Sequence, residues 1–351
     1  MVKKVRWISV YSAAHFAVDF ACAFFMFSRF HQEGNWYLLM LIYNFCAFAM
    51  QMPLGLGADC IGKERIFTVI GCIITGFAFG IGAWPIPAVM GLGLGNACFH
   101  VGGGWDVLKH AGGRDSMLGI FIAPGALGIY LGTIIGKKSG EMSGVFAVAV
   151  VSALFVLAVL LYQVRYWGGE AAAVDPHRDK PGRALSSKNL WGVVSLFLTV
   201  CLRSYMGLVQ NFPWKEEGYW GMILVLALVC GKAAGGFLAD WAGDRRTAVC
   251  SLGLAGILYC LSGNPLAGVI AVLLFNMTMP VTLGALTRML PKTKGFAFGI
   301  LSCALFLGYL PSYFGYGPEM PEAGLYVWIC LISGLLIWNG LGKAVKAWDG
   351  G

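Results

Sequence analysis

Six polar side chains lie inside long apolar stretches of this sequence, and their types could bind a proton or a small charged molecule. They are His15, Asp19, Asn96, His100, Arg203 and Asn276. The first two are four residues apart, as are the next two, so the members of each pair share one helix face. A histidine has a pKa of about 6.5, and its charge can therefore change near neutral pH. We predict that the six residues form a substrate- and proton-binding site.

Each of these residues also has a structural explanation. The histidines could lie in a hydrated vestibule or bind backbone carbonyls, the asparagines could join helices by hydrogen bonds, and the aspartate and arginine could form a structural ion pair. We favour a functional site because a charge in hydrocarbon needs a partner or a water-filled cavity. Counting about 1.5 Å per residue also places four of them near the middle of their predicted helices. These are Asp19, His100, Arg203 and Asn276.

Composition points to a membrane protein. Of the 351 residues, 58% are hydrophobic and 12% are charged, whereas a soluble domain carries about 25% charge. Apolar stretches of about 20 residues, long enough to cross a bilayer as helices, recur along the chain. The net charge of +8 comes from basic residues between these stretches, which indicates membrane topology and not a nucleic-acid surface. The 11 cysteines include no Cys-x-x-Cys pair, so neither a disulfide framework nor a metal site is expected.

We predict an all-α membrane protein with twelve transmembrane helices in two six-helix halves. The first half, 1–166, has spans near 7–28, 36–57, 66–84, 86–108, 115–136 and 144–166. The second half, 190–351, has spans near 190–212, 217–238, 247–263, 265–288, 295–315 and 323–342. The basic N-terminus leads directly into the first apolar stretch, which we interpret as a span and not as a signal peptide. The polar stretch 167–189 is predicted to link the halves, and the lysine and arginine bias places it and both termini in the cytoplasm.

A short polar turn occurs twice in the chain. Gly55–Arg65 (GLGADCIGKER) and Gly236–Arg246 (GFLADWAGDRR) share an aspartate, a glycine and an arginine at a shift of 181 residues. Asn96 recurs as Asn276 at a shift of 180. The two halves are therefore predicted to repeat one structural pattern.

Six plus six helices, a central linker and a Gly-x-x-x-Asp-x-x-Gly turn after the second helix of each half resemble the major facilitator superfamily of transporters. The resemblance implies that the first and fourth helices of each half line a cavity and that the repeated turn gates the cytoplasmic side. The implied gating residues are Asp59, Gly62, Arg65, Arg114, Asp240, Gly243 and Arg246. We expect the aspartates to pair with basic groups or helix N-termini in one gating state. The alternative is a basic loop that only sets topology.

The stretch 95–132 resembles the fosmidomycin-resistance-type drug exporters within that superfamily. The shared features are Phe99-His100 in the fourth span, Gly113-Arg114 in the next loop, and Gly125, Gly128 and Gly132 in the fifth span. Val101 stands where those exporters have a proline. Asp106 and Lys109, at the end of the fourth span, are expected to form a solvated pair. The resemblance supports this exporter subfamily and says less about the drug that would be carried.

We therefore expect a proton-coupled exporter, an antiporter that moves a small organic molecule by alternating access. One alternative is uptake or exchange of a small anionic metabolite. Another is a transport-inactive membrane sensor, which Cys60 and Trp241 would suit because the resembled family usually has arginine there. No paired carboxylates, metal-ligand motif or nucleophile elbow indicates an enzyme. The expected partners are substrate, protons and the lipid bilayer of the inner cell membrane, with no nucleic acid, no cofactor or metal, and a monomeric state.

Overall fold

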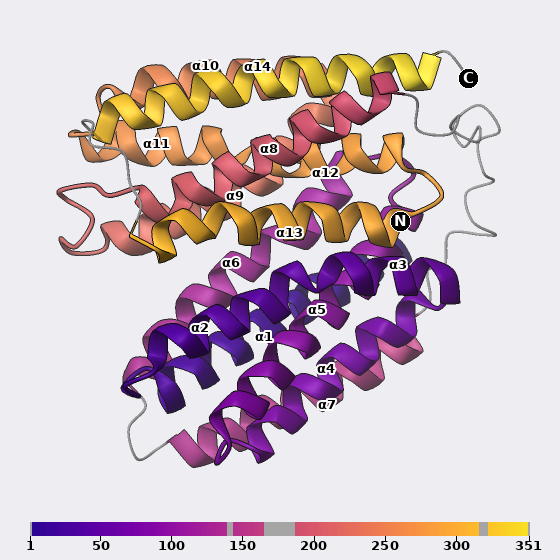
Figure 1. Ribbon diagram of the computed structural model, residues 1–351, viewed down its shortest axis with the longest axis vertical. Helices are drawn as coiled ribbons and strands as arrows, with labels where there is room; N and C mark the ends of the chain where they lie inside the picture. The colour runs from indigo at the N-terminus through magenta and orange to yellow at the C-terminus, as the bar shows by residue number, and fades with distance from the viewer. Residues whose placement is uncertain (1, 139–142, 165–186, 316–321, 350–351) are drawn as a thin grey trace. The chain divides into compact units, whose positions relative to one another are not determined.

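The computed structural model describes residues 2–138, 143–164, 187–315 and 322–349, which form helices joined by short turns, with no β-strand among them (Figure 1). The prediction of an all-α protein is confirmed. The helices fall into two compact units, and each unit is described by itself. Most of the predicted linker, residues 165–186, lies outside the described part of the chain.

Unit 1 comprises the described residues of Met1–His110, Pro124–Ala171 and Thr293–Cys303. Its complete helices are α1 (Val2–Phe25), η1 (Met26–Phe30), α2 (Trp36–Asn44), η2 (Phe45–Ala49), α3 (Gln51–Ile61), α4 (Glu64–Gly80), α5 (Pro85–His110) and α7 (Ser143–Gln163). η1 and η2 are single π-helical turns. α5 packs against α1, α2, α3 and α4, and α7 packs against α1 and α4. The core of this unit is thus built around α5.

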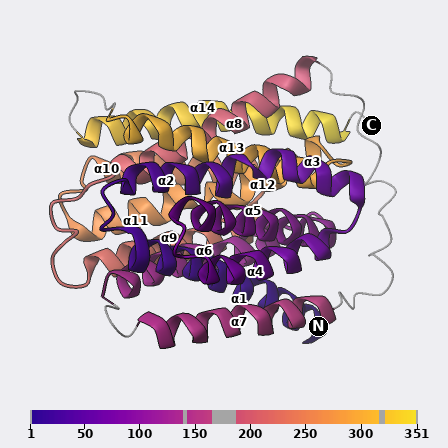
Figure 2. The ribbon, with the colours of Figure 1, turned by 60° about the horizontal axis from the view of Figure 1, so that its bottom comes forward.

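Unit 2 comprises the described residues of Ala111–Ala123, Ala172–Lys292 and Ala304–Gly351. Its complete helices are α8 (Ser187–Val209), α9 (Trp220–Ala242), α10 (Asp244–Tyr259), α11 (Pro265–Asn276), α12 (Thr278–Met289) and α14 (Glu322–Asp349). α14 packs against both α8 and α10, and α11 packs against α9 and α10, as Figure 2 also shows for α8 and α14.

Two helices are divided between the units. α6 (Asp115–Lys138) contributes residues 115–123 to unit 2 and 124–138 to unit 1. α13 (Lys294–Tyr313) contributes residues 294–303 to unit 1 and 304–313 to unit 2. The predicted halves assign each helix whole to one half, and nothing in the hydropathy pattern indicates this exchange.

Nine helical segments of the described chain are long and apolar enough to cross a membrane. Three of them join neighbouring elements: Arg6–Phe30, Trp36–Ile61 and Pro265–Met289. The predicted spans 66–84, 86–108 and 247–263 correspond to α4, α5 and α10, which are helical but not among the nine. α4 has only 17 residues and α10 only 16, and α5 carries polar residues in its middle. The count of twelve spans therefore stays a prediction.

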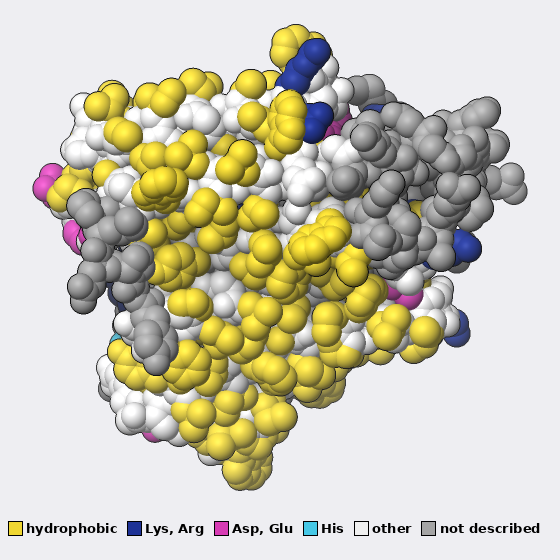
Figure 3. Space-filling view, turned by 45° about the horizontal axis from the view of Figure 1, so that its top comes forward, with side chains coloured by type: hydrophobic (Ala, Val, Ile, Leu, Met, Phe, Trp, Pro, Cys, Tyr) yellow, Lys and Arg dark blue, Asp and Glu magenta, His cyan; other side chains and the backbone are white. Residues whose placement is uncertain are grey.

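Apolar side chains cover much of the outside of these helices. Phe77, Val148 and Leu335 are each more than half exposed, and Figure 3 shows such side chains gathered over much of the visible face. A water-soluble protein rarely exposes apolar patches this large. The surface fits contact with lipid.

Close contact between α4 and α5 depends on three glycines. A Cβ at Gly71 would lie 2.3 Å from the backbone nitrogen of Phe99, and one at Gly102 would lie 2.4 Å from the backbone nitrogen of Thr68. A Cβ at Gly95 would lie 2.5 Å from a hydroxyl oxygen on α4. Small residues allow such close helix packing in membranes, where van der Waals contact drives association. This packing fixes the face that α5 turns toward α1.

Candidate substrate and proton site

The four predicted site residues of unit 1 meet at the contact between α1 and α5. We call His15, Asp19, Asn96 and His100 the α1–α5 cluster; all four are buried. Nε2 of His15 lies 3.3 Å from Oδ2 of Asp19, and Nε2 of His100 lies 3.7 Å from Oδ1 of Asp19. The two Nε2 atoms are 2.9 Å apart. One carboxylate and two imidazoles therefore share one small polar site.

Asn96 holds two members of the cluster in place. Its Nδ2 donates a hydrogen bond of 2.9 Å to Oδ1 of Asp19. Its backbone carbonyl lies 2.9 Å from Nδ1 of His100. A carbonyl can only accept, so Nδ1 of His100 carries the proton, and its Nε2 has a lone pair when the ring is neutral. The contact between His100 and the carbonyl of Asn96 follows from their spacing of four residues, which places both on one face of α5.

A stripe of glycines brings α6 against the same face of α1. A Cβ at Gly125 would lie 2.4 Å from both Oδ2 of Asp19 and Nε2 of His15. A Cβ at Gly128 would lie 2.4 Å from the carbonyl oxygen of Phe16, and Gly132 is equally close to the carbonyl oxygen of Phe20. The glycines that suggested a subfamily thus have a physical role: Gly125 leaves room beside the α1–α5 cluster, and Gly128 and Gly132 let α6 approach the backbone of α1.

A second polar cluster lies further along the same two helices. The hydroxyl of Tyr11 donates a hydrogen bond to Oδ2 of Asp106, and Nδ1 of His110 lies 2.9 Å from Oδ1 of Asp106. Asp106 is fully buried, so the expected solvated pair with Lys109 is wrong. Lys109 instead donates a hydrogen bond of 2.6 Å to Oε1 of Glu64. The error came from treating the end of α5 as a free helix, whereas α1 and α4 cover it.

The two predicted site residues of unit 2, Arg203 and Asn276, have different hydrogen-bond partners. Arg203 on α8 is buried, and its Nη1 donates a hydrogen bond of 3.2 Å to Oγ1 of Thr282 on α12. It pairs with no carboxylate among the described residues of unit 2. Asn276 is also buried, and its Nδ2 donates a hydrogen bond of 2.9 Å to the carbonyl oxygen of Val272 in its own helix. Arg203 is thus a buried cation whose described partner is a neutral hydroxyl.

The first copy of the repeated turn caps a helix. Asp59, near the end of α3, accepts hydrogen bonds from the backbone N–H groups of Gly295 and Phe296 at 2.9 and 2.8 Å. These N–H groups belong to the first turn of α13, where a helix offers no carbonyl acceptor for its own N–H groups. The positive end of the helix dipole also favours a carboxylate there. Gly62 ends α3 at φ 69°, a conformation that glycine adopts without strain. Arg65 lies close enough to Tyr11 to interact with it electrostatically.

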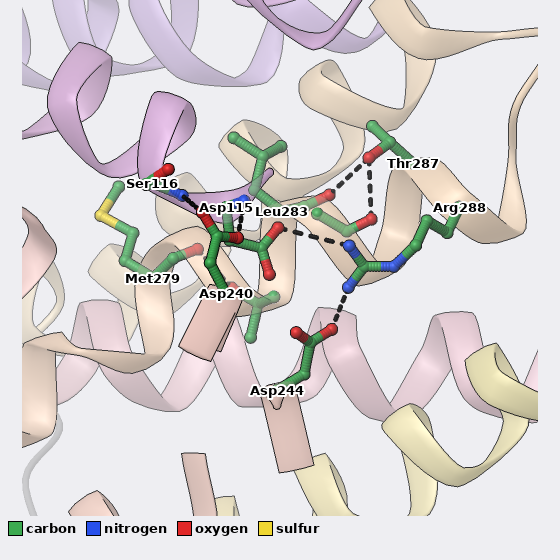
Figure 4. Close-up of polar contacts among 10 residues, drawn as sticks. Asp115, Ser116, Asp240, Asp244, Met279, Leu283, Thr287 and Arg288 are labelled. Atoms are coloured by element: carbon green, nitrogen blue, oxygen red, sulfur yellow. Dashed lines mark hydrogen bonds and ion pairs between the residues drawn. The ribbon is translucent and has the colours of Figure 1, made fainter. Parts of the chain in front are cut away.

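The second copy makes the equivalent contact in unit 2. Asp240 accepts hydrogen bonds from the backbone N–H groups of Asp115 and Ser116, the first residues of α6, at 2.7 and 3.2 Å (Figure 4). Gly243 follows α9 with φ 89°. Both aspartates therefore meet a helix N-terminus, which was one of the two kinds of partner that we expected.

Arg288, at the end of α12, extends this second site. Its guanidinium lies between the carboxylates of Asp115 and Asp244 and pairs with both, at 3.3 Å from Asp115 and more closely with Asp244 (Figure 4). Adding a Cβ at Gly284 would place it against Oδ1 of Asp115, so a glycine is needed for the carboxylate to reach Arg288. Unit 1 has a related acid–base pair, Glu64 with Lys109, at the corresponding helix ends.

Sequence reasoning missed several of these residues. Arg288, Asp244 and Asp115 are not among the predicted site residues. Asp244 directly follows the glycine of the second turn, and Glu64 follows that of the first turn by two residues, so the repeat could have identified it. Arg114 and Arg246, which were predicted to gate, are exposed and form no ion pair among the described residues.

Comparison with known proteins adds a fold-level result. No family model and no curated protein sequence matches the chain. The E. coli fucose:proton symporter FucP is similar in structure, with a TM-score of 0.62 at 11% identity over 97% of this chain and 98% of that one. FucP in its outward conformation, described as a Major Facilitator Superfamily transporter, gives 0.57 at 11% identity over 96% and 99%. The chain has the major facilitator fold.

A second similar structure is a bacterial homologue of the iron transporter ferroportin in an outward-facing state. It gives a TM-score of 0.60 at 12% identity, and the alignment covers 98% of this chain and 99% of that one. Together with this likeness in fold, the nine long apolar helical segments support a multi-pass membrane protein. What the protein does depends on its site and not on the fold.

Proposed function

We propose that this protein is a proton-coupled antiporter that exports a small organic molecule by alternating access between two six-helix halves. The observation that carries the proposal is the α1–α5 cluster. A carboxylate and two imidazoles buried within 3.7 Å of each other in a membrane protein are costly unless they serve a function. Intramembrane groups of this kind commonly form proton sites in transporters.

The geometry of the cluster suits exchange. Asp19 contacts both histidines and Asn96, so a proton bound by one member changes the charge that the others experience. A substrate that binds to the same atoms alters their proton affinity, and the proton alters substrate affinity by the same factor. If the cluster holds a proton or a substrate but not both, one must leave before the other binds. Such competition produces counter-transport.

The repeated turn would gate this exchange. Asp59 and Asp240 each hold the first turn of a helix that is divided between the units. Breaking these hydrogen bonds would free α13 and α6 to move, which is the kind of change that alternating access requires.

The proposal includes twelve spans, completed by α4, α5 and α10, with both termini and the linker in the cytoplasm of a cell with an inner membrane. It also includes a relation to the fosmidomycin-resistance type of exporter, supported by the sequence features around His100. One structural neighbour is named as a proton symporter, which supports the proton part of the proposal.

A resistance assay tests export. An efflux-deficient bacterial host would express wild type, His100→Ala or His31→Ala and be exposed to a panel of drugs and metabolite analogues that includes fosmidomycin. His31 lies outside the α1–α5 cluster, so it serves as a matched histidine control. Protection by wild type and His31→Ala, but not by His100→Ala, is the expected result. Hypersensitivity caused by wild type would establish uptake instead.

A flux measurement tests proton coupling directly. Purified protein in liposomes would be given a substrate from the panel while internal pH is recorded. Wild type should move protons against the substrate, and Asp19→Asn, whose side chain has the same size, should not when equal amounts of folded protein are compared. Equal proton movement by both proteins would remove the cluster from the mechanism.

Arg203 favours a second candidate, uptake or exchange of an anionic metabolite. It is a buried guanidinium with a neutral hydroxyl as its described partner, and such a group binds carboxylate or phosphate through two parallel hydrogen bonds. Competition between neutral and anionic analogues in the same liposomes separates the two candidates. If wild type prefers the anionic analogue and Arg203→Gln loses this preference, the second candidate function is favoured.

A further inference from the structure

We propose that His15, Asp19 and His100 form a binding site for a divalent first-row transition-metal ion. Two imidazole nitrogens and one carboxylate oxygen, drawn from α1 and α5, all lie within 4.8 Å of one another and are buried. Two histidines and one carboxylate are a ligand set that proteins use for Zn²⁺ and Fe²⁺. The inference goes beyond the proposed function, because an ion can bind whether or not the protein exports anything.

The spacing of the donor atoms suits an ion. Donors about 2.0–2.2 Å from a tetrahedral metal are about 3.3–3.6 Å from each other. The two Nε2 atoms are 2.9 Å apart, and each lies 3.3 or 3.7 Å from a different oxygen of Asp19. With one oxygen as the ligand, the three donor atoms lie within 4.8 Å of one another, so rotation of the Asp19 carboxylate would bring one oxygen toward both imidazoles.

Hydrogen bonds with Asn96 orient two of the three donor residues. The hydrogen bond between Nδ1 of His100 and the carbonyl oxygen of Asn96 leaves the Nε2 lone pair of His100 directed at the cluster. The amide of Asn96 orients Asp19 through Oδ1. Partners of this kind fix the tautomer and direction of metal ligands. Two of the three donor residues, His100 and Asp19, therefore have the supporting contacts that are typical of a metal site.

One further atom points to a ligand. Oδ1 of Asn96 is buried and has no hydrogen-bond partner among the described residues. A buried acceptor without a donor is costly, and native proteins rarely leave one unsatisfied. A water molecule bound to the ion would be a suitable donor, since a three-ligand site keeps at least one coordination position for water.

Gly125 provides the room. A Cβ there would come within 2.4 Å of both Oδ2 of Asp19 and Nε2 of His15, so the side of these donors that faces α6 is kept free of side-chain atoms. An alanine would place a methyl group against two of the three donors. Metal binding should therefore depend on a residue that is not itself a ligand.

The ion and the proton would compete for the same atoms. Metal ligands must be deprotonated, so binding an ion releases protons and weakens as the pH falls. Two neutral histidines and one carboxylate give the site a charge of about −1, and a bound divalent ion would change it to about +1. We therefore expect affinity to fall as the pH is lowered.

The test is titration of purified, detergent-solubilised full-length protein with Zn²⁺ by calorimetry and with Co²⁺ by visible absorption. The protein would carry no histidine tag, and its exposed cysteines, Cys60, Cys230, Cys250 and Cys260, would be alkylated first. Wild type should bind one ion, and the Co²⁺ spectrum should report nitrogen and oxygen ligands. His15→Ala and His100→Ala should each weaken binding by about 100-fold or more, and Asn96→Ala by about 10–100-fold.

Controls make the result decisive. His31→Ala should bind as wild type does, and Gly125→Ala should lose affinity with its three ligands intact. Thermal unfolding with and without Zn²⁺ should show a stabilisation of folded wild type that the ligand variants lack. Folded wild type that binds no ion, or binding unchanged in both His15→Ala and His100→Ala, would overturn the proposal. Transport assays run in chelator test the proposed function separately, so the two ideas can fail independently.

Discussion

The carboxylate of Asp59 accepts a hydrogen bond of 2.9 Å from the backbone N–H of Gly295, which is 236 residues away in the sequence. Asp240 makes the matching contact with the backbone N–H of Asp115, 125 residues away. Asp59 belongs to the first half of the sequence and caps α13, a helix of the second half. Asp240 belongs to the second half and caps α6, a helix of the first half. The sequence repeat is therefore also a repeat of one capping interaction.

Removing this cap should destabilise the protein. Hydrogen bonds to a charged group contribute about 1.5–3 kcal/mol, and a carboxylate at a helix N-terminus adds about 0.3–1 kcal/mol. We expect Asp59→Ala to lower the apparent unfolding temperature in detergent, and Asp240→Ala to do so by less, because Asp240 is more exposed. Glu33→Ala, which removes an exposed acid in a turn, is the control. Equal stability of Asp59→Ala and Glu33→Ala would contradict a capping role.

Two glycines of α3 offer a matched pair for packing. A Cβ at Gly55 would lie 2.2 Å from the carbonyl oxygen of Gly295, whereas one at Gly57 would meet nothing within 4 Å. We expect Gly55→Ala to cost about 1–3 kcal/mol through overpacking. Gly57→Ala should be neutral or stabilise by up to about 1 kcal/mol, because alanine favours helix. Thermal unfolding of both variants checks the order, and a reversed order would refute the close contact.

Arg288 should be more important for stability than an exposed arginine. Arg288→Ala leaves Asp115 buried with its carboxylate charge unpaired, and breaking such a pair costs about 3 kcal/mol or more. Arg246→Ala should change stability by no more than about 0.5 kcal/mol. Adding Asp115→Asn to Arg288→Ala removes the orphaned charge and should restore part of the loss. A double variant as unstable as the sum of the single variants would show that the two residues do not interact.

Arg203 should show opposite effects on stability and transport. Its buried guanidinium has only a neutral described partner in unit 2, and burying a charge without a counter-charge is costly. We expect Arg203→Gln to unfold at the same or a higher temperature than wild type while losing transport of anionic substrates. Thr282→Val, which removes only the described partner, should retain transport. Loss of stability in Arg203→Gln would instead assign the arginine to the fold.

The sequence alone predicted the class of protein and much of its pattern. Apolar stretches predicted the helices, because a helix in lipid must satisfy its own backbone. The repeat predicted that Asp59 and Asp240 have equivalent roles, and the i, i+4 spacing predicted that His15 lies beside Asp19 on one helix face. These features are local or periodic, so one chain contains enough information to read them.

Only the tertiary structure decided which distant residues meet. The packing of α1 against α5 joins His15 to His100 and buries Asp106 beneath Tyr11, and the contacts of α12 place Arg288 beside Asp115. Hydropathy specifies that a helix is buried but not which of its faces meets which neighbour. That choice depends on glycines that allow close approach and on side chains that fit together, and neither is visible until the helices are packed.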